Sequence, residues 1–417
     1  MKKIIASAGL VAVGASGLQA VNYGDIAPEN ANKRWSVSAA VRGFYDDNYA
    51  TRPSDQKEGS FGFEVVPSFN LNMPMETSFL GLSYLYGMSY YEDRSSDKVD
   101  QTHDAKLTFD HRFSERSRLN FVNQFIYSLE PTILDQGSVV NVPLRAEANA
   151  IHNRAVVSFD TMLTRQWSLL LGYENNYWNY QDDGGDGSYS ALLDRDEHLI
   201  RLDPTYQLSP NTKLFAGYQL GYNDYLSEDA LAVGSPLVGA DRDSVSHYGY
   251  LGAKQQVSSA LSLEGRVGVQ YFDYTKLDDS NVSPYLDLFG SYAYLPGSSL
   301  KFGLRQAHNA TDVGVSGAAL DQVTLDQETT TVYASANHRI SSDLTGGLMA
   351  QYQHSVYNGG DVDGEADDYV SVGASLAYKL DLHWSLEANY SLDWLSSDIE
   401  NRGFTRNRVS FGVRGTF

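Results

Sequence analysis

Histidine is the residue type in this chain best suited to chemistry, because its ring exchanges protons near neutral pH. Alternation along the surrounding segments places four of the nine histidines on an apolar face, namely His111, His198, His338 and His354. Three others are expected in loops with no nucleophile at a recognised spacing: His103, His152 and His308. The chain has no cysteine and no G-x-S-x-G, H-E-x-x-H or glycine-rich phosphate-loop motif. The sequence therefore predicts no enzyme and no cofactor.

Basic side chains recur beside short turns, at positions that alternate away from the apolar residues of the same segment. These residues are Arg112, Arg118, Lys213, Lys301, Arg339, Lys379 and Arg414. If the segments enclose water, a ring of such side chains at one depth selects for anions. Alternatively, the ring members form salt bridges with acidic neighbours such as Asp110 and Glu387. Both interpretations stay open at this stage.

Acidic residues outnumber basic ones, and the formal net charge of −21 argues against nucleic acid as a partner. Many acids gather in the expected loops, and the run Asp361-Val-Asp363-Gly-Glu365 places alternating carboxylates around a glycine. Such a pattern is a weak calcium candidate, because calcium prefers carboxylate oxygens and no full EF-hand motif is present. Divalent-ion bridges to lipopolysaccharide are the alternative role for these acids.

The last nine residues explain what positions these side chains. Val409, Phe411, Val413 and the terminal Phe417 alternate with polar residues, which indicates a strand with one apolar face. An aromatic residue on a final edge strand is an aggregation hazard. We therefore expect residues 409–417 to pair with the first strand, near Trp35, and to close a barrel.

A repeat at the short turns supports this architecture. An apolar residue ends one strand, turn-forming residues follow, and a second apolar residue stands six positions after the first, as in Met73/Phe79, Phe113/Leu119 and Leu208/Leu214. Seven such turns, and an eighth after Ile340 that departs by placing Gly346 at the second position, predict about 18 strands, with 16 as the alternative. Longer loops connect the strands at the other end. Two groups of aromatic residues border the strands, as at lipid headgroups. The fold class is thus an all-β, transmembrane, antiparallel up-and-down β-barrel.

The longer loops at residues 129–150, 226–242 and 308–327 are partly apolar. Residues such as Val139, Leu231 and Val233 are expected either to fold inward as a lid or constriction, or to belong to strands that extend beyond the membrane.

The N-terminus predicts export. Lys2 and Lys3 precede an apolar segment, and Leu18-Gln19-Ala20 is a cleavage site of the expected kind. We therefore assign residues 1–20 to a signal peptide, 21–34 to a periplasmic lead-in and 35–417 to the barrel. A barrel of this size is too wide for its own side chains to fill, so its lumen holds water unless a loop plugs it.

The signal peptide, repeated hairpins and terminal Phe417 resemble those of porin-type outer-membrane barrels. The size, acidic loops and tyrosine-rich strands are similar to those of the putative β-barrel porin-2 family, whose members are often associated with exopolysaccharide export. The resemblance implies a channel for polar or anionic solutes, with a structural or adhesive barrel as the alternative. It places the chain in the outer membrane of a Gram-negative-type bacterium. The expected partners are outer-membrane lipid, lipopolysaccharide, the barrel-assembly machinery and polar solutes or polysaccharide. The sequence leaves a homo-oligomer open.

Overall fold

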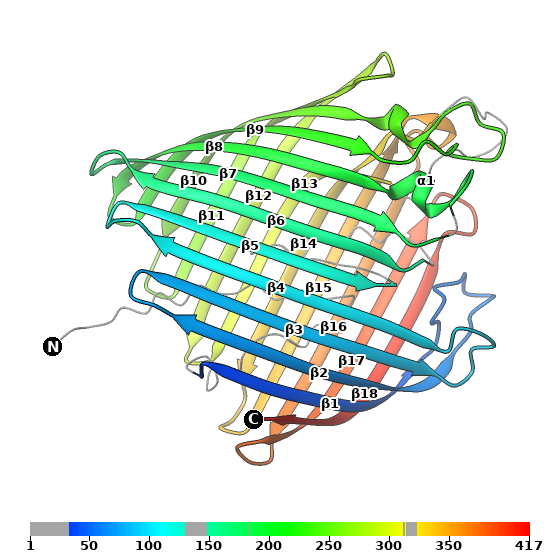
Figure 1. Ribbon diagram of the computed structural model, residues 1–417, viewed down its shortest axis with the longest axis horizontal. Helices are drawn as coiled ribbons and strands as arrows, with labels where there is room; N and C mark the ends of the chain where they lie inside the picture. The colour runs from blue at the N-terminus through cyan, green and yellow to red at the C-terminus, as the bar shows by residue number, and fades with distance from the viewer. Residues whose placement is uncertain (1–32, 130–147, 183, 312, 314–322) are drawn as a thin grey trace.

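The chain forms one antiparallel sheet of 18 strands that closes on itself (Figure 1). The computed structural model describes residues 33–129, 148–182, 184–311, 313 and 323–417. Each strand pairs with its neighbours in sequence, and β1 pairs with β18. The predicted fold class and the count of 18 rather than 16 are thus confirmed. The predicted signal peptide and most of the lead-in lie outside the described residues.

The strands follow one another around the barrel. Their bounds are β1 Trp35–Asp46, β2 Ser60–Pro74, β3 Ser78–Tyr91, β4 Val99–Arg112, β5 Ser117–Ser128, β6 Ala150–Met162, β7 Trp167–Tyr180, β8 Arg195–Ser209, β9 Thr212–Tyr225, β10 Ser244–Gln256, β11 Leu261–Tyr274, β12 Asp279–Leu295, β13 Ser298–Asn309, β14 Asp326–Arg339, β15 Leu344–Asn358, β16 Ala366–Lys379, β17 Trp384–Ser397 and β18 Phe404–Thr416. Among the described residues, three short helices lie between strands: α1 (Tyr189–Leu193), η1 (Gly239–Arg242) and η2 (Gly360–Val362). No helix among the described residues is long and apolar enough to cross a membrane.

Period-2 alternation separates the two faces of the wall. Along β1, exposed and buried residues alternate without a break; Trp35 and Val41 are exposed, whereas Arg42 and Asp46 are buried. This arrangement is the inverse of that of a water-soluble sheet, because the outer face is apolar and the inner face is polar. The outer face is therefore the side that meets lipid.

The terminal strand closes the barrel as expected. The backbone N–H of Phe417 donates to the carbonyl of Val37 over 2.9 Å, and the N–H of Val37 donates back over 3.1 Å. Val409 and Phe411 are exposed on the outer face, and Val413 pairs with the exposed Val41. Pairing with β1 removes the open edge that a final strand would otherwise leave.

Eight short turns lie at one end of the barrel, and both termini of the described sheet lie at that end (Figure 1). The six-residue spacing keeps pairs such as Leu208/Leu214 on the outer face, where both are exposed. The pair Met73/Phe79 departs from this expectation. Met73 is exposed and stands opposite Leu80, whereas Phe79 stands opposite Pro74 on the inner face. The β2–β3 turn is shorter by one position, which moves Phe79 to the other face.

At the other end, connections between strands pack together as a lid. We define the lid cluster as Ala148, Ala150, Tyr180, Leu192, Leu193, Leu231, Tyr274, Val323 and Leu325, which are all buried together. The prediction that Leu231 folds inward is therefore confirmed, whereas Val233 remains exposed and Val139 lies outside the described residues. At the same end, β11 and β12 project as a hairpin joined by residues 275–278, which is not one of the three loops considered above (Figure 1).

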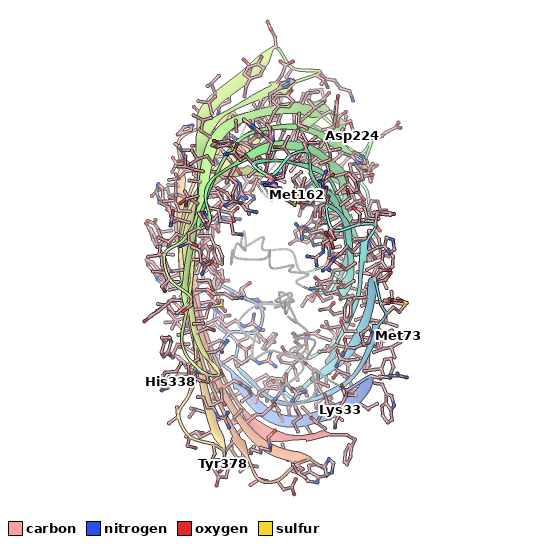
Figure 2. The ribbon with its side chains drawn as sticks, turned by 90° about the vertical axis from the view of Figure 1, so that its left-hand side faces the viewer. Lys33, Met73, Met162, Asp224, His338 and Tyr378 are labelled. Carbon is pink, nitrogen blue, oxygen red and sulfur yellow. The ribbon has the colours of Figure 1, made fainter. Side chains whose placement is uncertain are left out.

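Figure 2 looks along the barrel from the end that carries the short turns. The wall forms an elongated ring, and the described side chains line its inner and outer faces. At the narrow end formed by β18, β1 and β2, charged inner side chains of these strands contact one another. Arg42 and Glu64 there are almost fully buried.

Candidate pore lining

The structure places all seven predicted basic residues on the inner face near the short turns. Their neighbours across the ladder are inner-face residues: Arg112 stands opposite Arg118, and Lys213 stands opposite Lys254. Lys301 stands opposite Ser335, Arg339 opposite Thr345, Lys379 opposite Ser385 and Arg414 opposite Ala40. The seven side chains thus share one end of the lumen, which is the placement that the proposed ring requires.

Some of these cations are neutralised. Arg118 Nη2 lies 2.5 Å from Asp110 Oδ2, and Arg414 Nε lies 2.5 Å from Glu387 Oε1. Lys379 also has an interaction partner. For Arg118 and Arg414, the salt-bridge interpretation describes the structure better than a free ring does.

Four ring members have no carboxylate partner. No Asp or Glu oxygen of the described residues lies within 4.0 Å of the charged nitrogens of Arg112, Lys213, Lys301 or Arg339. Arg339 instead donates from its guanidinium to the carbonyls of Ser341 and Ser342, each over 3.3 Å. An unpaired cation projects more field into water than a paired one does.

Sequence reasoning missed a further cation beside this group. Lys254 on β10 faces Lys213 on β9, so two like charges stand opposite each other. Lys254 Nζ lies 3.1 Å from Glu264 Oε2, which neutralises that member of the pair. Two signals in the sequence could have identified it. Alternation along β10 assigns Lys254 to the inner face, and Lys254 stands two residues before the end of the strand, beside a short turn.

Deeper in the lumen, the inner charges form dense networks. Arg42 on β1 donates to Glu64 on β2 over 2.6 Å and to Glu387 on β17 over 2.6 Å. Arg408 Nη2 adds a second bond to Glu64, over 3.0 Å. Arg42 reaches Glu387 across β18 because the intervening residue is Gly412, where an added Cβ would lie 2.6 Å from the Arg42 Cα. The network therefore depends on one glycine.

The opposite narrow end of the ring contains a second network. Arg201 pairs with Asp203 on β8, and the Tyr250 hydroxyl donates to Asp203 over 2.6 Å. Arg266 on β11 pairs with Asp287 on β12 over 2.9 Å. These contacts satisfy the buried charges by pairing them within the wall.

The histidines fall into two sets. His111, His198, His338 and His354 lie on the outer face as predicted, beside residues such as Phe113, Tyr173, Tyr294 and Tyr352. The prediction of loops for the second set was wrong: His103 lies in β4, His152 in β6 and His308 in β13. Strands at the lid end run further than turn chemistry alone suggested.

His308 also has a serine neighbour that the sequence did not reveal. Its Nε2 lies 2.6 Å from the hydroxyl of Ser283 on β12, and its Nδ1 lies 3.1 Å from Asp326 Oδ2 on β14. The Nδ1 nevertheless makes no hydrogen bond of acceptable geometry, and the side chain is only 1% exposed. A general base needs an aligned orienting partner and an approach for substrate. The buried His308 ring, whose Nδ1 is not aligned with Asp326, does not meet these two requirements. The three residues act as a clasp between strands.

The calcium candidate receives no support. Among the described residues, no group of three or more His, Asp or Glu side chains is arranged to hold a metal ion. Asp363 instead accepts a hydrogen bond from the backbone of Gly359 over 2.9 Å and so stabilises its own turn. Asp361 and Glu365 are near it in sequence but do not complete a ligand set.

A family model described as Putative beta-barrel porin 2 matches residues 36–417, and no curated protein matches the chain. Similar solved structures include OpdK from Pseudomonas aeruginosa, at 13% identity over 92% of this chain and 99% of that chain, with a TM-score of 0.44. Another is OccK2 (OpdF) from Pseudomonas aeruginosa in complex with glucuronate, at 12% identity, 92% and 98% coverage and a TM-score of 0.45. A third is a BenF-like porin from Pseudomonas fluorescens Pf-5, at 12% identity, 92% and 99% coverage and a TM-score of 0.44.

The assignment of this chain to a family depends on the family model and on the closed barrel. The family model covers nearly every residue that forms the barrel wall. The chain therefore belongs to the Putative beta-barrel porin 2 family and is a porin-type β-barrel of the Gram-negative outer membrane.

Proposed function

We propose that this barrel is a channel that passes polar solutes and favours anions. The observation that carries the proposal is the group of unpaired inner cations at the end with the short turns, which we name the basic mouth: Arg112, Lys213, Lys301 and Arg339. The deeper charges are mostly paired with one another, so they contribute little net field. The basic mouth therefore sets the sign of the potential that a solute meets there.

Reversal potential in planar bilayers under a KCl gradient tests this selectivity. We expect the wild-type protein to prefer chloride, and the variant R112Q/K213Q/K301Q/R339Q to lose that preference or reverse it. The matched control is R52Q, which removes one charge from an exposed loop pair and leaves the lumen unchanged. Cation preference in the wild-type protein, or a reversal potential unchanged in the fourfold variant, would contradict the proposal.

The alternative of a structural or adhesive barrel predicts a different result. In liposome swelling, a channel admits small sugars and charged sugar acids, whereas a closed barrel admits neither. The lid cluster covers part of one end, so the assay is run with the full chain and with neutral and anionic sugars of equal size. Swelling that is absent for every solute would favour the structural barrel.

A link to exopolysaccharide export is the finer part of the proposal. It is supported by the family resemblance and not by any single residue. The test is the amount of extracellular polysaccharide made by cells without the protein, and by the same cells complemented with the fourfold variant. Unchanged polysaccharide in the deletion strain would remove this part and leave the channel proposal intact.

A further inference from the structure

Arg242 is the most unusual charged residue of the lid. It is the last residue of η1, between β9 and β10, and it is 0% exposed. Its guanidinium lies 4.2 Å from the centre of the Tyr225 ring, and its Nη2 donates to the carbonyl of Leu192 at the end of α1. The side chain thus packs between two inward-folded connections.

The rest of the guanidinium has no partner. Its Nε and Nη1 are buried and make no hydrogen bond, and no carboxylate of the residues that the structure describes lies within 4.0 Å of the guanidinium. Burial lowers the pKa of Arg242, and the neighbouring Arg195 cation acts in the same direction. Arg195 is a like charge and cannot neutralise Arg242. The carboxylate of Glu197 is paired with Arg195 over 2.6 Å, and Arg195 also donates to the carbonyl of Leu193 over 2.9 Å.

A buried cation without a counter-ion is rare, because desolvation of the charge is costly unless an anion compensates it. A guanidinium binds the two oxygens of a carboxylate through a fork of adjacent N–H groups, formed by Nη2 with either Nε or Nη1. Nη2 of Arg242 has two N–H groups and donates to the carbonyl of Leu192, so its second N–H can complete a fork with the unpartnered Nε or Nη1. The surroundings are apolar, since Leu192, Leu193 and Leu231 belong to the lid cluster. An anion with an apolar body suits such a setting better than a strongly hydrated phosphate does.

We propose that Arg242 is the centre of a binding site for a small organic carboxylate with an apolar body, at the lid end of the lumen. The inference rests on the proposed function, because it names a class of anion that the channel receives before the basic mouth. Aromatic and aliphatic lid residues contact the body of the ligand, and the fork of Arg242 contacts its carboxylate.

Entry requires the two connections to separate, because Arg242 is fully covered. Hydrogen bonds between exposed groups join them at the surface: Gly185 N donates to Asp229 Oδ2 over 3.0 Å, and Ala230 N donates to Asp186 Oδ1 over 3.2 Å. Bonds of this kind exchange readily with water, so they hold the lid less firmly than the strand ladders hold the wall.

Isothermal titration calorimetry of the detergent-solubilised full chain tests the site with hexanoate as the probe. We expect hexanoate to bind, hexanamide of equal shape not to bind, and R242Q to weaken hexanoate binding at least tenfold. R242K keeps the charge but loses the fork, so we expect an intermediate affinity, and it replaces R242Q if that variant does not fold. R52Q is the matched control and should bind like the wild-type protein.

Either of two results would overturn the inference: no hexanoate binding to the folded wild-type protein, or equal binding by wild type and the folded Arg242 variant. The reversal potential separates this failure from that of the proposed function. Anion preference without hexanoate binding removes only the Arg242 site. Hexanoate binding without anion preference removes the selectivity proposal and shows that the site acts by itself.

Discussion

The buried charge network at the closing seam should make Arg42 one of the most sensitive residues of the wall. Its side chain is 0% exposed, and those of its partners Glu64 and Glu387 are 3% and 6% exposed. R42M removes the cation while keeping most of the side-chain volume. Two carboxylates from β2 and β17 then remain in a poorly hydrated part of the wall.

The expected loss can be bounded from the contacts. Breaking a buried ion pair by removing one partner costs about 3–5 kcal/mol. Here Glu64 keeps Arg408 at 3.0 Å, and Glu387 keeps Arg414 at 2.5 Å. Because neither carboxylate becomes fully unpaired, we expect R42M to lower the free energy of unfolding by about 2–3 kcal/mol, below the full cost of an orphaned buried charge.

Urea unfolding of the protein in lipid vesicles, followed by tryptophan fluorescence, measures this loss. The matched control is R52M, which breaks the Arg52–Glu58 pair, whose side chains are 45% and 46% exposed. An exposed pair contributes about 0–1 kcal/mol, so R52M should unfold almost like the wild-type protein. Equal losses for R42M and R52M would refute the reasoning, because burial would then have no bearing on the strength of these pairs.

Two further predictions concern the clasp and the terminal strand. We expect H308N to lower the free energy of unfolding in urea by about 1–3 kcal/mol, and by more than S283A does. We also expect the wild-type protein to resist a fluorophosphonate probe; labelling of Ser283 would instead assign it a catalytic role. We propose that Val409, Phe411, Val413 and Phe417 guide barrel assembly, so deletion of Phe417, which removes two backbone bonds to Val37, should reduce the heat-modifiable fraction in outer membranes. An unchanged fraction would remove that role.

The strands and turns could be predicted from the sequence because their signals are local. Alternation assigns Trp35 and Arg42 to opposite faces without reference to any other strand. Turn residues such as those after Leu208 mark where a strand ends. The same reasoning assigned Phe79 to the wrong face, because the β2–β3 turn is shorter by one position. It also assigned the lid-end histidines to loops, because the strands there extend into regions without turn signals.

Side-chain partners could not be predicted in the same way. Arg42 and Glu387 are 345 positions apart in sequence, and they meet only because the sheet closes and Gly412 leaves room between them. The ladder between β12 and β13 ends at the Leu286/Gln306 pair. His308 and Ser283 lie beyond that pair, so ladder pairing does not define their contact. Both contacts depend on register and curvature, which alternation along one strand does not encode.

This difference matters for function because arginine and lysine at inner positions have opposite consequences with and without a carboxylate partner. Arg42 and Arg414 are held by carboxylates, so they stabilise the wall and contribute little to the field in the lumen. Arg339 and Lys213 have no such partner in the part of the chain that the structure describes, so they remain available to a passing solute. Net charge is an equally poor guide, since the chain is strongly acidic while its basic mouth is not. Selectivity in this barrel therefore follows from which cations the register leaves without a carboxylate partner. The fourfold variant should change ion selectivity, whereas R42M should change the free energy of unfolding.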